Sequence, residues 1–114
     1  MINSSALLRN LAQVDLKLKN IIWKDEFLDK IVTKHGVSER EVNEVLLFSL
    51  PHIRFAEKGR VKDEHVYVAY GQAESGRYLV IFFIYKGKGA ALPISARDMS
   101  AAERTYYNEQ TEAT

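Results

Sequence analysis

The chain has 114 residues, of which 46% are hydrophobic and 27% are charged, a composition typical of one soluble globular domain. It has no cysteine, which excludes disulfide frameworks and zinc sites built on thiolates. The net charge of +1 is unevenly distributed, because residues 54–97 hold eight basic and four acidic side chains, whereas residues 98–114 hold one basic and four acidic. An anionic partner would be attracted to the middle of the chain, although a solvated charged surface explains the same excess.

The sequence also bears on membranes and location. Its first residues lack the cationic and apolar segments of a secretion signal. The longest apolar run, residues 78–85, is far shorter than the roughly 20 residues that span a bilayer. We therefore expect no membrane contact and a cytoplasmic location.

The N-terminal region divides into an extension and the start of the main domain. Residues 1–15 are expected to form a short amphipathic helix or a loosely ordered segment. Apolar residues alternate with lysines over residues 16–23, which predicts a strand. The main domain should then cover residues 16–110, followed by a tail at 111–114.

Two helices are expected next. An apolar stripe over residues 27–32 predicts a helix that ends at Gly36. Ser38 and Glu41 have the spacing of a capping box, so a second helix should begin there, and Pro51 should end it.

The remaining pattern is mostly strand. Four segments predict antiparallel strands, at residues 52–55, 65–72, 77–85 and 90–97. The continuous apolar run in 77–85 is typical of a central strand covered on both faces, and Pro93 indicates an edge position or a bulge in the last strand. Ser100 and Glu103 form a second capping box that opens a terminal helix through about residue 110. The sequence therefore predicts an α+β fold with an antiparallel sheet of four to five strands, two helices before the meander and one after it, in two layers.

The candidate functional residues are suited to binding or cleaving a phosphodiester. No metal-binding spacing of histidines, serine elbow or phosphate loop is present, which leaves metal-free phosphate chemistry or plain binding. Arg77 begins the predicted central strand and Arg97 ends the last one, so both could hold a phosphate at the same rim of the sheet. A surface salt bridge, for example between Arg97 and Asp98, is an equally good interpretation. His35 could transfer a proton near neutral pH or simply cap the first helix.

Other side chains are weaker candidates. Glu64 could act as a base, although a loop glutamate is more often a solvated charge. Tyr106 and Tyr107 could donate a proton or stack on a nucleobase, although Tyr106 could equally belong to the core.

These residues occur in short phrases that, taken in order, resemble the BrnT family of type II toxins, which share the RelE-like ribonuclease fold. The matching phrases lie within residues 20–107 and are Trp23, Lys34-His35-Gly36-Val37, Glu44-Val45, Gly71 with Gly76-Arg77, Ile94-Ser95-Ala96-Arg97, and Glu103-Arg104 with Tyr107. Each phrase alone is a weak indication of the family, whereas the ordered set is fairly specific to it.

The resemblance implies an endoribonuclease toxin that cuts RNA, stalls translation and is neutralised by a small DNA-binding antitoxin. Carried over by residue, it implies phosphate binding by Arg77 and Arg97 and proton transfer by His35. RNA contacts are expected from three basic residues and one tyrosine, namely Lys34, Arg60, Lys62 and Tyr107. Neither a metal nor another cofactor is expected, and the chain could form a homo-oligomer.

Two expectations follow for experiment. Alanine at Arg77 or Arg97 should abolish cleavage and leave thermal unfolding nearly unchanged. In the alternative interpretation, the chain is a non-catalytic RNA- or protein-binding relative that binds RNA and leaves it uncut.

Overall fold

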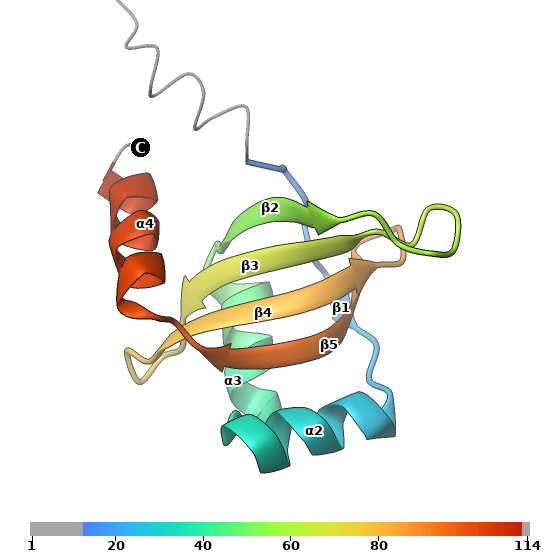
Figure 1. Cartoon of the computed structure of the whole chain (residues 1–114), viewed down its shortest axis with the longest axis horizontal. Helices are drawn as coiled ribbons and strands as arrows, with labels where there is room; N and C mark the ends of the chain where they lie inside the picture. Colours follow the sequence, from blue (N-terminus) through green and yellow to red (C-terminus); the bar gives the residue numbers. More distant parts are fainter. Residues whose placement is uncertain (1–12, 113–114) are drawn as a thin grey trace, which may run out of the picture.

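The computed structural model describes residues 13–112 and forms them into a five-stranded sheet with helices on both faces (Figure 1). In chain order the elements are β1 (Asn20–Ile21), α2 (Asp25–His35), α3 (Glu39–Asn43), the π-helical turn η1 (Glu44–Phe48), β2 (His52–Glu57), β3 (Val66–Gln72), β4 (Tyr78–Tyr85), β5 (Ala90–Asp98) and α4 (Ala101–Glu112). The strand order is β1-β5-β4-β3-β2, and all pairs are antiparallel except β1 with β5. The predicted α+β class, with two helices before the meander and one after it, is confirmed.

Local sequence chemistry sets the end of α2 and the start of α3. Gly36 ends α2 with a φ of 62°, a left-handed conformation that glycine adopts without a steric penalty. Ser38 and Glu41 cap each other's backbone N–H groups, as the capping-box spacing predicted. The second helix continues as η1 and ends at Phe48, shortly before Pro51.

The strand predicted over residues 16–23 is shorter than expected. Only Asn20 and Ile21 pair with β5, opposite Ala90 and Ala91. Because this pairing is parallel, residues before Asn20 would need partners in the turn before β5, where no strand exists. Leu16 and Leu18 nevertheless pack against the core, so the alternating pattern reported burial correctly but strand pairing only in part. The predicted extension falls mainly on residues 1–12, outside the described part of the chain.

The meander follows the sequence pattern closely. β4 is the middle strand of five, as its continuous apolar run predicted. Pro93 marks a bulge, since the register between β4 and β5 shifts between Phe82 and Phe83. Pro93 also lies on the outer side of the sheet, because among the described residues β1 pairs only with Ala90 and Ala91 at the beginning of β5.

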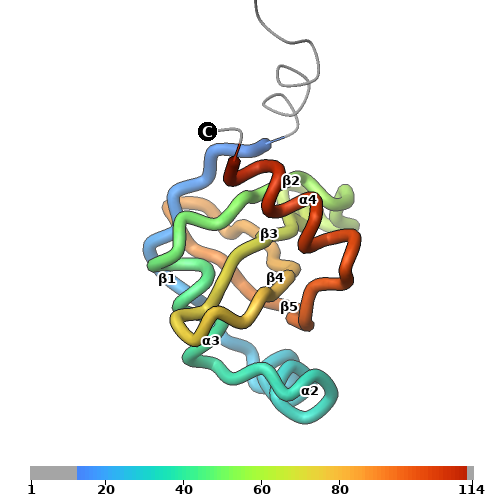
Figure 2. The backbone as a smooth tube through the Cα atoms, turned by 90° about the vertical axis from the view of Figure 1, so that its left-hand side faces the viewer, coloured from blue at the N-terminus to red at the C-terminus, as the bar shows by residue number. Residues whose placement is uncertain are grey.

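Each face of the sheet carries an apolar layer. Leu79, Ile81 and Phe83 of β4 are fully buried in the layer that contains residues of α2, α3 and η1. Val80 of the same strand belongs to the other layer, with Tyr107 of α4. Figure 2 shows α4 and α3 on different sides of the strands. Among residues 13–112, α2, α3 and η1 therefore cover one face of the sheet, and α4 covers the other.

Gly71 lets η1 approach β3 closely. A Cβ atom at this position would lie 2.8 Å from Cγ1 of Val45 and 3.0 Å from Oγ of Ser49. Both distances are shorter than ordinary van der Waals contact, so a side chain here would push η1 away from the sheet.

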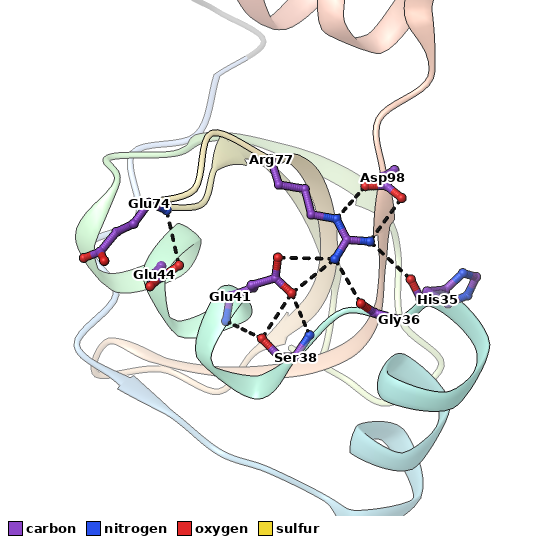
Figure 3. A network of polar contacts seen from close by, with 8 residues as sticks. All are labelled: His35, Gly36, Ser38, Glu41, Glu44, Glu74, Arg77 and Asp98. Carbon is purple, nitrogen blue, oxygen red and sulfur yellow. Dashed lines mark hydrogen bonds and ion pairs between the residues drawn. The ribbon is translucent and has the colours of Figure 1, made fainter.

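One guanidinium group joins the sheet to the ends of both early helices (Figure 3). Nε and Nη2 of Arg77 donate to the two carboxylate oxygens of Asp98 at 2.7 and 3.1 Å. Nη1 donates to both carboxylate oxygens of Glu41 at 3.1 and 3.2 Å and to the backbone carbonyl of Gly36 at 2.9 Å, and Nη2 reaches the carbonyl of His35 at 3.3 Å. Arg77 thereby holds β4, β5, α3 and the C-terminus of α2 together, where backbone carbonyls lack helical partners.

The electrostatics agree with this arrangement. Hydrogen bonds from Arg77 lower the pKa of Asp98. Partial burial opposes ionisation of Glu41, yet hydrogen bonds from the Ser38 backbone and from Arg77 lower its pKa below the usual value. Both carboxylates are therefore ionised at neutral pH, as the guanidinium requires.

A second arginine–carboxylate pair fixes the start of α4. Nη1 and Nη2 of Arg97 donate to the two carboxylate oxygens of Glu103 at 2.6 and 2.9 Å. Glu103 also accepts from the backbone N–H of Ser100, which completes the predicted capping box. Hydrogen bonds from Arg97 lower the pKa of Glu103 to about 2.

We predict that Arg77→Met destabilises the fold by about 1 to 3 kcal/mol, because it removes several charge-assisted hydrogen bonds that partial exposure weakens but does not abolish. The control is Arg40→Met, since the side chain of Arg40 is 82% exposed and pairs with Glu44 one helical turn away. This control should cost no more than about 0.5 kcal/mol. Urea denaturation measures both variants, and equal losses would refute the role of Arg77.

We predict that Glu103→Gln destabilises the protein by about 1 to 2 kcal/mol at pH 7 and that this difference disappears near pH 2. The pKa of Glu103 is about 2 in the folded state and 4.5 for a glutamate without partners, as in the unfolded chain. The stabilisation is therefore complete above about pH 4.5 and is lost as the pH falls towards 2. Unfolding free energies of both proteins between pH 7 and 2 test this directly. A difference that stays constant with pH would show that the ion pair contributes nothing.

Candidate nucleic-acid interface

Two rows of side chains cross the sheet on the side of α4. Strand register places four residues opposite one another in each row. The first row consists of His52, Tyr70, Val80 and Arg97, and the second consists of Arg54, Val68, Phe82 and Ser95. These eight residues are here called the α4 face. The second row keeps solvent access, because Arg54, Phe82 and Ser95 are only partly buried.

A histidine and a tyrosine meet between this face and α4. Nε2 of His52 lies 2.7 Å from the hydroxyl oxygen of Tyr106, within hydrogen-bond distance. The two rings are 5.4 Å apart in an edge-on arrangement, and the ring of Tyr70 lies 5.2 Å from that of Tyr106. The guanidinium carbon of Arg54 lies 5.1 Å from the centre of the Tyr106 ring. Residues of β2, β3 and α4, which are far apart in the sequence, thus meet at one hydrogen-bonded histidine–tyrosine pair.

The environment keeps this pair uncharged at neutral pH. Burial, followed by the nearby charge of Arg54, lowers the pKa of His52. Burial raises the pKa of Tyr106. The neutral imidazole therefore retains an unprotonated nitrogen, and the phenol retains its proton.

Arg54 and Arg97 lie on β2 and β5, towards opposite sides of the α4 face. Among residues 13–112, Arg54 forms no ion pair, and its guanidinium contacts Tyr106 through the ring and through a side-chain hydrogen bond. Arg97 is paired with Glu103, and its side chain remains 39% exposed beside the ring of Phe82 at 5.8 Å. This face therefore combines two cations, an accessible aromatic ring and a hydrogen-bonded histidine–tyrosine pair.

The sequence prediction for Arg77 and Arg97 was right about the rim and wrong about a shared site. Both lie at the end of the sheet where β4 begins and β5 ends. Arg77 points into the helical layer, towards Glu41, whereas Arg97 points towards α4. Arg97 lies opposite Val80 and shares its face of the sheet. Val80 comes three positions after Arg77, and side chains alternate between the two faces along a strand. The two arginines therefore occupy opposite faces.

His35 and Lys34 lie on the helical side with Arg77. Both are exposed at the end of α2, and the carbonyl of His35 binds Arg77. The structure therefore does not bring His35 and Arg97 together around one cleft. The contacts of Arg77 argue against the expectation that alanine at this position leaves thermal unfolding nearly unchanged, because its guanidinium holds several elements together.

The remaining candidates lie elsewhere. Arg60 and Lys62 are exposed on the loop between β2 and β3, where Glu64 is paired with Lys86. Tyr107 is 7% exposed and packs edge-on against Tyr78 at 6.0 Å, so it serves the core and cannot stack on a nucleobase.

Sequence reasoning missed the roles of His52 and Arg54 in this arrangement. Their alternation with Ile53 was visible and placed both on one face of a strand. The proximity of His52 to Tyr106, 54 positions later, depends on how α4 docks, and no local pattern reports it.

The described residues offer neither a membrane-spanning helix nor a cluster of metal-binding side chains. Within residues 13–112 no helix has the length and apolar character needed to cross a membrane. In the same part of the chain, histidine and acidic side chains form no group of three suited to a metal ion.

Comparisons with known proteins were made for the whole chain. The family model described as "Ribonuclease toxin, BrnT, of type II toxin-antitoxin system" matches residues 23–103. The crystal structure of the Brucella abortus ribonuclease toxin BrnT is similar with a TM-score of 0.51 and 22% sequence identity, covering 71% of this chain and 96% of that one. No curated protein matches. The structural likeness supports the fold, and the family match extends over more than half of the chain. The chain therefore belongs to the BrnT family of ribonuclease toxins from type II toxin–antitoxin systems.

Proposed function

We propose that this protein is an endoribonuclease toxin that binds single-stranded RNA across the α4 face and cleaves it without a metal ion. Cleavage would block translation, and a small DNA-binding antitoxin would neutralise the protein. Family membership supports the reaction class. The observation that carries the site is the placement of Arg54 and Arg97 on either side of Phe82.

The reaction requires positive charge around the scissile phosphate. RNA cleaves itself when a 2′-hydroxyl attacks the adjacent phosphorus, and negative charge then accumulates on the non-bridging oxygens. A guanidinium group stabilises this charge by donating two parallel hydrogen bonds and stays protonated throughout. Two arginines can therefore supply in this site the electrostatic stabilisation that other nucleases obtain from metal ions.

Arg54 is the better placed of the two for a first phosphate contact, because no carboxylate among the described residues competes for it. Arg97 uses both Nη atoms on Glu103 and also donates from Nη1 to the carbonyl of Asp98. Its Nε–H makes no hydrogen bond within the described residues and remains available to a ligand. Glu103 therefore holds the Arg97 side chain in position while one donor edge stays free.

The aromatic ring of Phe82 and the loop between β2 and β3 extend the proposed interface. A base can stack on a partly exposed ring with little sequence preference. Arg60 and Lys62 on the loop would contact flanking phosphates, which gives an affinity that falls as salt increases. Lys34 and His35 lie on the helical side and are not part of this site.

A non-catalytic RNA-binding relative is the second candidate. The pairing of Arg97 with Glu103 favours it, because a guanidinium held by a carboxylate is less available to a transition state. In that case the purified protein would bind RNA in a salt-dependent manner and leave it intact.

We predict that the wild-type protein cleaves a single-stranded RNA in buffer containing EDTA and that Arg54→Ala lowers the rate by about 100-fold, since one donor to the developing charge is lost. The matched control is Arg40→Ala, which removes an exposed arginine from the helical side and should cleave like wild type. Gel analysis of a labelled RNA gives the rates. Binding without cleavage by the wild-type protein would favour the second candidate, and equal rates for Arg54→Ala and wild type would reject the α4 face as the site.

A further inference from the structure

We propose that Tyr106 and His52 form the proton-accepting pair of this site, with Tyr106 contacting the attacking 2′-hydroxyl and His52 receiving the proton through it. This inference rests on the proposed ribonuclease function and assigns the base of that reaction. Tyr106 lies just beyond the segment that the family model matches, residues 23–103, so family membership does not assign this role.

The geometry supports a relay through the tyrosine. His52 is only 5% exposed, whereas Tyr106 is partly exposed, so an RNA substrate can reach the tyrosine and not the imidazole. The 2.7 Å separation of Nε2 and the hydroxyl oxygen permits direct proton transfer between the two side chains. The Tyr70 ring lies against both partners, 6.2 Å from His52 and 5.2 Å from Tyr106, and limits their movement.

The charges around the pair favour a neutral resting state. Arg54 on β2 faces the pair from one side, and Tyr70 on β3 contacts both rings. Arg97 on β5 interacts electrostatically with Tyr70. On α4, Glu103 is occupied by Arg97. No carboxylate of the described residues makes a hydrogen bond or ion pair with His52, so its imidazole stays unprotonated and able to accept a proton.

A bound phosphodiester changes this balance. Its negative charge, placed between Arg54 and Arg97, would offset the repulsion between Arg54 and a protonated His52. The imidazole thus becomes a stronger base when the substrate is present. This coupling explains how a histidine beside an arginine can still accept a proton during the reaction.

The cleavage step moves one proton from the 2′-hydroxyl to Tyr106 and one from Tyr106 to His52. The 2′-oxygen forms a bond to phosphorus as its proton moves to the hydroxyl oxygen of Tyr106, and the phenolic proton moves to Nε2 of His52. The bond between phosphorus and the 5′-oxygen breaks, and that oxygen takes a proton from water. The hydroxide that remains takes up the proton from His52, so the products are a 2′,3′-cyclic phosphate and a 5′-hydroxyl, with the pair restored.

The experiment compares Tyr106→Phe with the control Tyr67→Phe, which removes a hydroxyl from the other face of the sheet. Tyr106→Phe keeps the ring that Arg54 and Tyr70 contact and removes only the proton-transferring oxygen. We expect RNA cleavage by Tyr106→Phe to fall by about 100- to 1,000-fold, with RNA affinity within about twofold of wild type. Tyr67→Phe should cleave and bind like wild type.

A second variant separates proton transfer from a purely structural hydrogen bond. His52→Gln can still hydrogen-bond to Tyr106 but does not titrate. The wild-type rate should rise with pH through an apparent pKa below 6.5, and His52→Gln should lose this rising limb.

The outcomes distinguish this inference from the proposed function. If wild type and Tyr106→Phe cleave equally while Arg54→Ala is slow, the pair assignment is wrong and the ribonuclease site stands. Should His52→Gln keep the wild-type pH profile, His52 is structural and the relay is overturned. A wild-type protein that binds RNA and never cleaves it would overturn both.

Discussion

The guanidinium of Arg77 is the contact on which the rest of the arrangement depends. The end of a sheet and the ends of two helices each carry polar groups that need partners, and this one side chain supplies donors to all of them. Because Asp98 is one of its partners, the last residue of β5 is fixed, and α4 starts from a defined point a few residues later. The position of α4 in turn decides where Tyr106 meets His52. A cationic residue that the sequence suggested for catalysis thus acts on the site indirectly, through the fold.

Much of the fold could be predicted because its signals are local. The capping boxes at Ser38 and Ser100 and the left-handed Gly36 each depend on residues within one helical turn. The alternating patterns of the strands report which face is buried, and they predicted the meander and the central place of β4. The pattern failed where pairing rather than burial was in question, since Leu16 and Leu18 pack against the core without a partner strand. A local sequence pattern predicts whether a side chain is buried more directly than it predicts which strand the backbone pairs with.

The arrangement of the candidate side chains was predicted less well, for a physical reason. The rim shared by Arg77 and Arg97 follows from strand order, but the face to which each side chain points depends on register, and a shift of one residue reverses it. Arginines on opposite faces find separate carboxylates, Glu41 and Glu103, and each pair stabilises a different layer. The cluster of His52, Arg54 and Tyr106 arises from the docking of α4, which no sequence pattern encodes. The resemblance to BrnT toxins identified the family correctly.

The central claim is that RNA binds the α4 face and not the helical side of the sheet. NMR spectra of the labelled protein with a single-stranded RNA that carries 2′-O-methyl groups throughout, and so cannot be cleaved through its 2′-hydroxyls, test this most directly. The account predicts that the largest chemical-shift changes occur at Arg54, Phe82 and Arg97 and weaken as salt is raised. Changes centred on Lys34 and His35, with the α4 face unaffected, would contradict it.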